Sequence, residues 1–440
     1  MSRVTSGPPR SSRPRRRTLR AALAAPLLAA ALFVAACGEE KADSSTAADA
    51  APAATSTTAT GAGGTASGPL GDAARLAAAY VGGTPGRADA SLKPVKIGFI
   101  NTQGGVEDDP DATATAQAAV DLVNEQLGGI EGHPLELETC FVVNAAEDNQ
   151  ACAQRFAADD DVAVVQIGMG SALDPIYTTL RGRRAILGGL AIEPSSLVAP
   201  AVFYTPGAAR TGTTMAQFAK DRLDARKVAF VYGGDERGVQ ALAPAFEDLG
   251  MTYTAASMGE EGAQLNAALV ATKAKDADAI VFLGSGATCA QLEKTKTSLG
   301  IDTPVIGTDL CASREVAEAL GDYPRWNFIY QSANYNDPSN PEVAAVQAAM
   351  EEYQSGVPYS LIFPFGNTLA LAKIFNELGV DALTFENVER ALRAFEGPVF
   401  AGPQRLACGS LAAEGQPALC SPTAIVSSYV GDDVWEDNTP

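Results

Sequence analysis

VKIGFI, at residues 95–100, is a largely apolar run interrupted by Lys96 alone, and such a run is typical of a strand buried on both faces. Residues 113–126 then carry apolar side chains at helical spacing, and Gly128-Gly129 ends that helix. The alternation continues with PLELETCFV (134–142), a helix near 151–158, VAVVQIG (162–168), a helix near 174–181 and AILGGL (185–190). Continuous apolar strands joined by helices predict an α/β unit with a parallel sheet.

A second block repeats this pattern further along the chain. It comprises the runs KVAFVYG (227–233), MTYTAAS (251–257), AIVFLGSG (279–286) and PVIGT (304–308), with helices near 239–249, 264–273 and 290–299. Two similar blocks predict two lobes, and VFYTPG (202–207) and NFIYQSA (327–333) are candidate crossing strands between them. Ligands of such sheets bind beyond the carboxyl ends of the strands, so the cleft between the lobes is the expected site.

The N-terminus reads as an export signal. Residues 11–20 (SSRPRRRTLR) are strongly basic, and the apolar run at 21–36 is shorter than a membrane span requires. The run ends in Val34-Ala35-Ala36-Cys37-Gly38, which resembles a bacterial lipobox, in which the cysteine becomes an acylated first residue. A plain signal peptide is the alternative, and residues 14–20 faintly resemble a twin-arginine signal.

Composition shows where the charge of the chain lies. The 440 residues include 52 acids and 32 bases, for a net charge of −20. Seven arginines lie in residues 1–36, so the rest carries 25 bases against 52 acids, or −27. An acidic body argues against binding to nucleic acid or to an anionic lipid surface, so acyl chains on Cys37 would have to hold it at a membrane.

The single histidine restricts enzyme chemistry. It excludes a metal site built from several histidines, and a Ser-His-Asp triad would have to use His133, which we assign to a surface turn. Residues 168–173 (GMGSAL) lack the third glycine of a dinucleotide fingerprint, and residues 107–111 lack the glycine and terminal glutamate of a Ca²⁺ loop. We therefore expect no cofactor, no metal and no catalysis.

Six cysteines remain beyond Cys37, and an even number in an exported protein indicates disulfides. Fifteen pairings are possible in principle. The cysteines form three close-set couples, and no C-x-x-C pair suggests zinc or redox chemistry. We predict the bonds Cys140–Cys152, Cys289–Cys311 and Cys408–Cys420.

The expected organisation divides the chain into six segments. Residues 37–93 form a flexible tether rich in Ala, Ser, Thr and Gly, with one possible helix at 72–81, and the folded body begins at about Pro94. Helices at 340–354, 367–378 and 385–395 are expected to complete the first lobe. The segments are the signal peptide (1–36), the tether (37–93), the first lobe (94–208), the second lobe (209–332), return helices of the first lobe (333–397) and a return to the second lobe (398–440).

Four stretches carry a family resemblance. VKIGFINTQGG (95–105), AAVDLVNEQLGGIEGHPLELETC (118–140), VAVVQIGMGS (162–171) and KVAFVYGGDERG (227–238) resemble type I periplasmic binding proteins, chiefly those serving importers of branched-chain amino acids and amides. The resemblance covers about Pro94–Glu436. It implies two Rossmann-like lobes with parallel sheets joined by three crossover segments, a Venus-flytrap architecture.

The resemblance also implies ligand contacts in the first lobe. Family members hold a ligand carboxylate with hydroxyls and backbone N–H groups after the third and fourth strands, where this chain has Gly170, Ser171, Gly189, Leu190 and Ala191. The usual hydroxyl after the fourth strand is absent, since Leu190-Ala191 stands there. The alternative role for Ser171 is a helix cap.

In the second lobe the family places an aromatic residue in the loop after the first strand, where this chain has Asp235 and Arg237. This departure puts a simple aliphatic amino acid in doubt, because a guanidinium would suit a second carboxylate or a phosphate. Asp309 matches the acid that pairs with a ligand ammonium, and Ser285 and Thr288 match the neighbouring contact loop. A solvated loop for Arg237 and helix capping by Asp309 are the alternatives.

Phe363, with Phe365 nearby, completes the candidate site as an apolar cleft wall, although core packing is expected for at least one of the two. The function that the resemblance implies is a lipid-anchored, monomeric solute-binding protein outside the bacterial cytoplasmic membrane. It would deliver an amino acid, amide or similar small polar solute to an ABC transporter permease. The alternatives are a sensor ectodomain for a separate signalling partner and an extracytoplasmic hydrolase.

Overall fold

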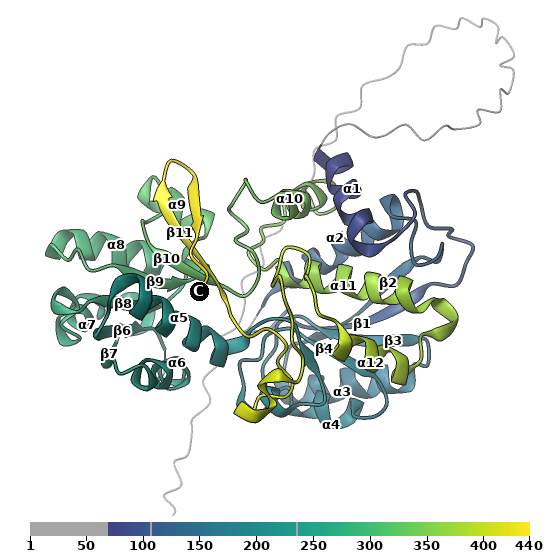
Figure 1. Cartoon of the computed structure of the whole chain (residues 1–440), viewed down its shortest axis with the longest axis horizontal. Coiled ribbons are helices and arrows are strands. Elements are labelled where there is room, and N and C mark those ends of the chain that lie inside the picture. The colour runs from purple at the N-terminus through teal and green to yellow at the C-terminus, as the bar shows by residue number, and fades with distance from the viewer. Residues whose placement is uncertain (1–68, 106–107, 235) are drawn as a thin grey trace, which may run out of the picture. The chain divides into compact units, whose positions relative to one another are not determined.

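The computed structural model describes residues 69–105, 108–234 and 236–440 (Figure 1). Cys37, the signal peptide and most of the expected tether lie outside these residues, as does Asp235. Within the described ranges no helix is long and apolar enough to cross a membrane.

The first lobe is built on a sheet with the strand order β2-β1-β3-β4-β5, all parallel among the described residues. Its strands are β1 (Val95–Thr102), β2 (Leu135–Val142), β3 (Val162–Ile167), β4 (Ala185–Gly188) and β5 (Val202–Phe203). Its helices are α1 (Pro69–Val81), α2 (Pro110–Gln126), α3 (Ala145–Ala158), α4 (Asp174–Leu180), α10 (Pro341–Tyr353), α11 (Phe363–Leu378) and α12 (Phe385–Ala394). Successive residues Val164 and Val165 enter different core clusters, so both faces of this sheet are covered, as its continuous apolar strands predict.

The second lobe has the strand order β12-β11-β10-β9-β8-β6-β7 in the part of the chain described. Its strands are β6 (Lys227–Tyr232), β7 (Thr252–Ser257), β8 (Ala279–Leu283), β9 (Val305–Thr308), β10 (Asn327–Tyr330), β11 (Ile425–Gly431) and β12 (Val434–Asp437). Its helices are α5 (Gly207–Leu223), α6 (Arg237–Asp248), α7 (Leu265–Ala271), α8 (Ala287–Leu299) and α9 (Arg314–Leu320). β11 and β12 are antiparallel to their neighbours, whereas β6 to β10 are parallel, as predicted.

The chain passes between the lobes along three crossings: after β5, after β10 and before β11. The first and second crossings are tied by the Gln331 side chain, which accepts from Gly207 N–H at 3.2 Å and donates to Thr211 Oγ1 at 2.7 Å. The first and third crossings are joined by two backbone hydrogen bonds of Phe203. Its N–H donates to Ala418 O at 2.9 Å, and its carbonyl accepts from Cys420 N–H at 3.0 Å. The predicted two-lobe α/β fold with three crossovers is confirmed.

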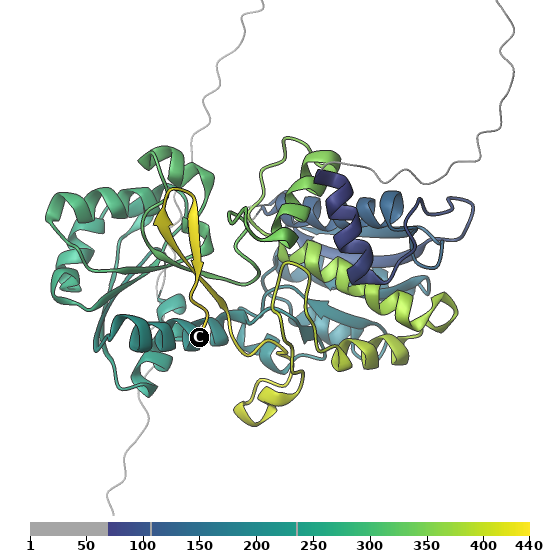
Figure 2. The same ribbon diagram turned by 45° about the horizontal axis from the view of Figure 1, so that its top comes forward.

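The contacts of the first lobe extend beyond the expected boundaries at Pro94 and at residue 398. α1 is part of the first lobe, because Ala73, Ala77 and Val81 are buried in its core and Tyr80 Oη donates to Pro398 O at 2.9 Å. Figures 1 and 2 both place α1 beside α10 and α11. The first lobe therefore begins by Pro69.

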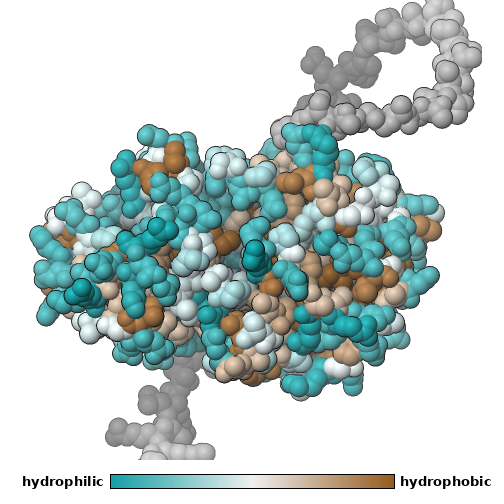
Figure 3. Space-filling view, viewed as in Figure 1, coloured by the Kyte–Doolittle hydropathy of each residue, from teal (hydrophilic) through white to brown (hydrophobic). Residues whose placement is uncertain are grey.

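Residues 398–420 also pack on the first lobe. The rings of Phe400 and Tyr80 meet edge to face, and Leu419 is buried beside first-lobe residues such as Phe203. The return to the second lobe thus occurs just before β11, because the apolar side chains of this stretch are buried against the first lobe. Polar residues cover most of the face seen in Figure 3, with apolar residues scattered in small groups.

The described residues contain all three predicted disulfides, Cys140–Cys152, Cys289–Cys311 and Cys408–Cys420. The first joins β2 to α3 on the first lobe, and the second joins α8 to the turn after β9 on the second. The third lies directly before the third crossing. Each pair is separated by only 12 or 22 residues, so its two cysteines lie on neighbouring elements within reach of a disulfide.

Candidate functional site

The first-lobe candidates lie where two adjacent parallel strands end. Gly170-Ser171 follows β3, and Gly189, Leu190 and Ala191 follow β4. A Cβ at Gly189 would lie 2.0 Å from Gly168 O, so only glycine permits this approach of the two strand ends. The Gly189 carbonyl accepts from Thr205 Oγ1 at 2.5 Å, and Ala191, only 1% exposed, accepts at its carbonyl from Ala208 N–H at 3.0 Å.

Glu193 occupies the backbone N–H groups beside Ser171. Its carboxylate oxygens accept from Ala172 N–H at 2.7 Å and from Leu173 N–H at 3.2 Å, immediately before α4. Leu173 is the N-cap of α4, with no side-chain cap bond, so Ser171 does not cap that helix. Glu193 is not among the residues expected from the sequence, because a contact between positions 21 residues apart leaves no local signal.

Asn149 supports the same loop from α3. Its Nδ2 donates to Ser171 O at 2.8 Å and to Ala172 O at 3.0 Å, and the residue is 1% exposed. Ala172 has a φ of +53°, in the left-handed region that residues with a Cβ adopt at a cost in free energy. Glu193 and Asn149 together hold Ala172 in this conformation from both sides of the peptide.

The second-lobe candidates gather at the ends of three adjacent strands, β6, β8 and β9. Arg237 is the first residue of α6 and is exposed, and its loop is joined to β8 because Gly233 N–H donates to Leu283 O at 3.0 Å. Ser285 and Thr288 are bonded to each other, since Ser285 N–H donates to Thr288 Oγ1 at 3.1 Å and Thr288 Oγ1 donates to Ser285 O at 2.8 Å. Cys289–Cys311 holds this turn beside Asp309.

Asp309 begins the short 3₁₀ turn η4 (Asp309–Cys311) at the end of β9. Its carboxylate accepts from Leu310 N–H at 3.0 Å, and no ion pair to it exists among the described residues. Burial raises the pKa of the Asp309 carboxyl to about 7, an effect that the bond from Leu310 N–H opposes. Ser313, not Asp309, caps α9, because Ser313 Oγ accepts from Val316 N–H at 3.4 Å.

Two residues of the second crossing fix the Asp309 turn in place. Tyr335 Oη lies 3.3 Å from Asp309 O and 3.2 Å from Ala312 O, and Asn336 Nδ2 donates to Ala312 O at 2.5 Å. Tyr335 is not among the residues expected from the sequence, because no local pattern places a residue beyond β10 against the end of β9. The turn that carries the candidate ammonium-binding carboxyl is thus bonded through its backbone carbonyls to a crossing segment.

Phe363 lies at the start of α11 and is 3% exposed, while Phe365 belongs to the main core cluster. α11 begins four residues before the helix expected at Asn367, so both rings are carried on its first turn. Burial leaves Phe363 little surface for a ligand.

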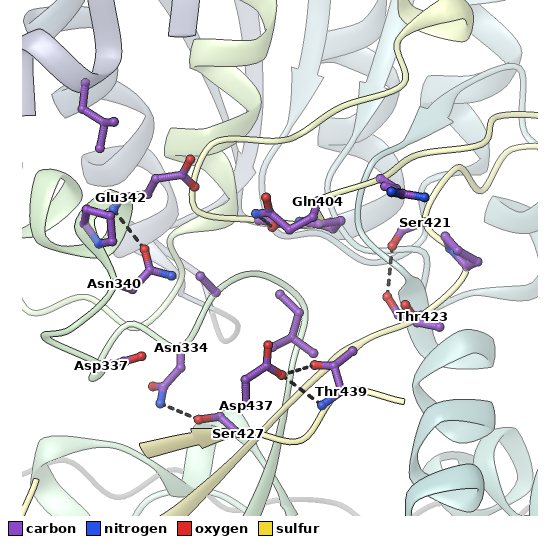
Figure 4. A pocket seen from close by; sticks show the side chains of 18 residues that line it. Asn334, Asp337, Asn340, Glu342, Gln404, Ser421, Thr423, Ser427, Asp437 and Thr439 are labelled. Atoms are coloured by element: carbon purple, nitrogen blue, oxygen red, sulfur yellow. Dashed lines mark hydrogen bonds between the residues drawn. The ribbon is translucent and has the colours of Figure 1, made fainter. Parts of the chain in front are cut away.

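Two cavities adjoin the crossings in the described part of the chain. One of about 1010 Å³ is lined from both lobes, by Asp111 of the first, by Arg314 and Glu315 of the second, and by Tyr335 between them. None of the predicted ligand residues lines it. The other, of about 780 Å³, lies beside the second and third crossings (Figure 4). Its polar groups are bonded to one another, as in Asn334 Nδ2 to Ser427 Oγ at 2.9 Å.

The described residues hold no group of three or more His, Cys, Asp or Glu side chains suited to a metal ion. His133 Nδ1 lies 2.8 Å from Lys93 O, a local contact in the turn before β2. Asp108, from the acidic turn after β1, accepts from Gly104 N–H at 2.9 Å.

A sequence profile of the periplasmic binding protein family matches residues 94–424. A search of curated proteins finds no match. Many solved structures are similar. One is the branched-chain amino acid transporter substrate-binding protein LivJ of Streptococcus pneumoniae in complex with isoleucine, at 18% identity and a TM-score of 0.59, covering 79% of this chain and 100% of that one.

Two further structures show the range of this similarity. An ABC transporter substrate-binding protein from Sphaerobacter thermophilus has 15% identity and a TM-score of 0.63, covering 79% of this chain and 97% of that one. A fatty acid ABC transporter substrate-binding protein from Thermomonospora curvata has 15% identity and a TM-score of 0.60, covering 81% and 94%. Likeness at these identities shows the fold and leaves the ligand to be argued from the site.

Proposed function

Because the chain belongs to the periplasmic binding protein family, and to its type I branch, we propose that it captures an amino acid, amide or similar small polar solute and delivers it to an ABC importer. Members of this family are extracytoplasmic substrate-binding proteins and not enzymes. The solute-binding role follows from the family, while the ligand class and the importer are our proposal.

One observation carries the proposal at the level of residues. Side chains from stretches far apart in sequence meet at the carboxyl ends of adjacent strands in each lobe, around Ser171 in the first and around Ser285 and Asp309 in the second. Carboxyl ends of parallel strands are where ligands of doubly wound sheets bind. A solute that contacts both edges would bridge the lobes.

Hinge closure is the mechanism that this arrangement supports. A solute that contacts both lobes binds the closed form more tightly than the open form and so shifts the population toward closure. The Asp309 turn is bonded to the second crossing through Tyr335, so occupation of the second-lobe edge acts on a segment that must move. The importer would recognise the closed form.

We propose further that the protein is a monomer anchored by acyl chains on Cys37. The lipobox-like sequence before Cys37 and the −27 charge of the remaining chain support this, because an acidic body is repelled by anionic lipids. Incorporation of labelled fatty acid into the full chain in a bacterial host, lost in Cys37→Ala, would test the anchor. Labelling that persists in Cys37→Ala would contradict it.

The central experiment is a thermal-shift screen of purified protein with amino acids, amides, ureas, amines and small carboxylates. A ligand present at 100 times its Kd stabilises the folded state by about 2.7 kcal/mol, which raises Tm by several degrees. We expect at least one solute to raise Tm with a saturating dose response. Turnover of a hit to product would contradict the binding function, and so would a flat response across the panel.

A further inference from the structure

In the first lobe, two backbone N–H groups directly after the candidate residue Ser171 are already bonded to a carboxylate of the chain itself. The N–H groups of Ala172 and Leu173 donate to Glu193, an ionisable carboxyl of the chain itself. A ligand carboxylate placed there would have to displace Glu193 or lie beside it, and two like charges at that distance repel. The missing hydroxyl at Leu190-Ala191 removes a second anion donor from the same edge.

The second lobe presents the opposite chemistry, namely acceptors without a cation. The Asp309 side chain is partly buried and has no ion pair among the described residues. The buried hydroxyl oxygen of the preceding residue, Thr308 Oγ1, has no hydrogen-bond partner in the described structure. A partly buried carboxyl and an unpaired oxygen are stabilised when a ligand brings N–H donors and positive charge.

The larger cavity, which Asp309 itself does not line, has the same acidic character. Tyr335, whose hydroxyl bonds to Asp309 O, lines the cavity of about 1010 Å³. Its charged lining consists of four acids, Asp108, Asp111, Glu315 and Glu351, and one base, Arg314. The rings of Tyr335 and Tyr359 add aromatic faces, which attract cations. The space therefore suits the remaining length of a cationic solute.

We propose that the solute is an organic amine without a carboxylate, which places its ammonium group at Asp309 and extends toward the cavity beside Tyr335. The proposal rests on the solute-binding function above and narrows its ligand class. Glu193 is the specificity-determining residue in this scheme, because it fills with the chain's own carboxylate the position that the carboxylate of an amino acid would take. Arg237 does not oppose the proposal, because it is exposed and has an interaction within the chain.

Matched pairs that differ only in the carboxylate test the proposal directly. Isothermal titration calorimetry of the purified protein would compare 1,5-diaminopentane with lysine, agmatine with arginine, and 3-methylbutylamine with leucine. We expect the amine of at least one pair to bind ten or more times more tightly than its amino acid. Asp309→Asn should weaken that amine at least tenfold, and Asp248→Asn, an exposed acid of the same lobe, should leave it unchanged.

Glu193→Ala provides the reciprocal measurement. It frees the N–H groups of Ala172 and Leu173, so the preference for the amine over its amino acid should shrink at least threefold, whereas the exposed first-lobe control Glu386→Gln should keep it. If Glu193→Ala does not fold, the ranking of the pairs on the unaltered protein and the Asp309→Asn result still decide.

The outcomes separate this inference from the proposed function. Tighter binding of an amino acid than of its amine would overturn the inference and leave solute binding intact. The same holds if neither member of any pair binds while another solute of the broad panel does. If no solute binds, both the inference and the proposed solute-binding function are overturned.

Discussion

The two lobes carry similar sheets but treat the carboxyl ends of their strands differently. In the first lobe, Glu193 and Asn149 bond the turn after β3 from two sides, and Thr205 bonds the turn after β4. In the second lobe, a disulfide holds the turns together, and the partly buried Asp309 carboxyl has no cation beside it in the described structure. The first-lobe edge thus has the chain's own carboxylate on its backbone N–H groups and leaves the amide oxygen Asn149 Oδ1 without a partner among the described residues, whereas the second-lobe edge holds a carboxyl without a counter-charge.

This difference shows where selectivity for a ligand would originate. A satisfied edge contributes shape and order, since its donors are already occupied. An edge with a desolvated carboxyl gains most from a partner of opposite charge. Substitutions that change each edge separately test this difference between the lobes.

The largest effect is expected from the two lobe disulfides. Replacing both Cys289 and Cys311 by serine should lower the free energy of unfolding by about 3 kcal/mol, and the Cys140/Cys152 double replacement should cost slightly less, because its closed loop is shorter. Only the second-lobe variant should also weaken solute binding, because it releases the turns that carry Ser285 and Asp309. Urea denaturation and calorimetry measure the two effects. Equal loss of affinity in both variants would contradict the contrast between the lobes.

Glu193→Ala should destabilise the first lobe by about 2 kcal/mol, because it leaves two backbone N–H groups without their acceptor. Glu193→Gln should cost less, since its amide oxygen still accepts one of the two bonds. Glu386→Gln, at an exposed position of α12, should stay within about 0.5 kcal/mol of the original protein. Chemical denaturation at pH 7 gives all three values. A Glu193→Ala variant as stable as the control would mean that water replaces the carboxylate fully.

Asp309 should make stability fall with rising pH. Its folded pKa, about 7, exceeds the ordinary value of 3.8, so between these pH values the folded state binds more protons than the unfolded state. The original protein therefore loses stability as pH rises through this window. Asp309→Asn should lack that loss and be more stable at pH 8 by about 1–2 kcal/mol, with the difference vanishing near pH 4. Parallel pH profiles of the two proteins would show that Asp309 is solvated in the folded state.

The smallest expected effect is a difference in stability between alanine replacements of two serines, Ser313 and Ser171, which both follow strand ends. Ser313 caps α9 and its replacement by alanine should cost about 0.5–1 kcal/mol, measured by thermal denaturation. Ser171→Ala removes no cap bond of α4, because Leu173 is the N-cap there. A Ser171→Ala loss that exceeds the Ser313→Ala loss would assign Ser171 a structural role in the first-lobe edge.

Much of the fold could be predicted from sequence because it depends on local pattern. Runs such as those at β1, β6 and β8 are largely apolar, and their spacing by amphipathic helices specifies parallel α/β lobes. The disulfides followed from spacing for the same reason. The extent of the first lobe depends on burial decided at long range, since α1 continues the alanine-rich composition of the expected tether and is buried through its contacts with α10 and α11.

The candidate site likewise contains residues that local sequence predicts and residues that long-range packing brings in. Strand ends place Ser171, Ser285 and Asp309 from local sequence alone. Glu193 and Tyr335 act through contacts of 20 to 26 residues in separation, which depend on how elements pack after folding. The position of Phe363 illustrates the remaining difficulty, because the sequence could not say whether the first turn of α11 faces a core or a cleft.

The final hairpin of the chain has a consequence for association between molecules. β11 and β12 extend the second sheet beyond β10, and β12 ends in Glu436 and Asp437. Acidic side chains on an outer strand discourage pairing with the edge of another sheet. Without its last 16 residues the chain would keep its candidate ligand residues but present β10, with buried Phe328 and Tyr330, as a bare edge. The hairpin thus guards against edge-to-edge aggregation wherever many copies crowd one surface.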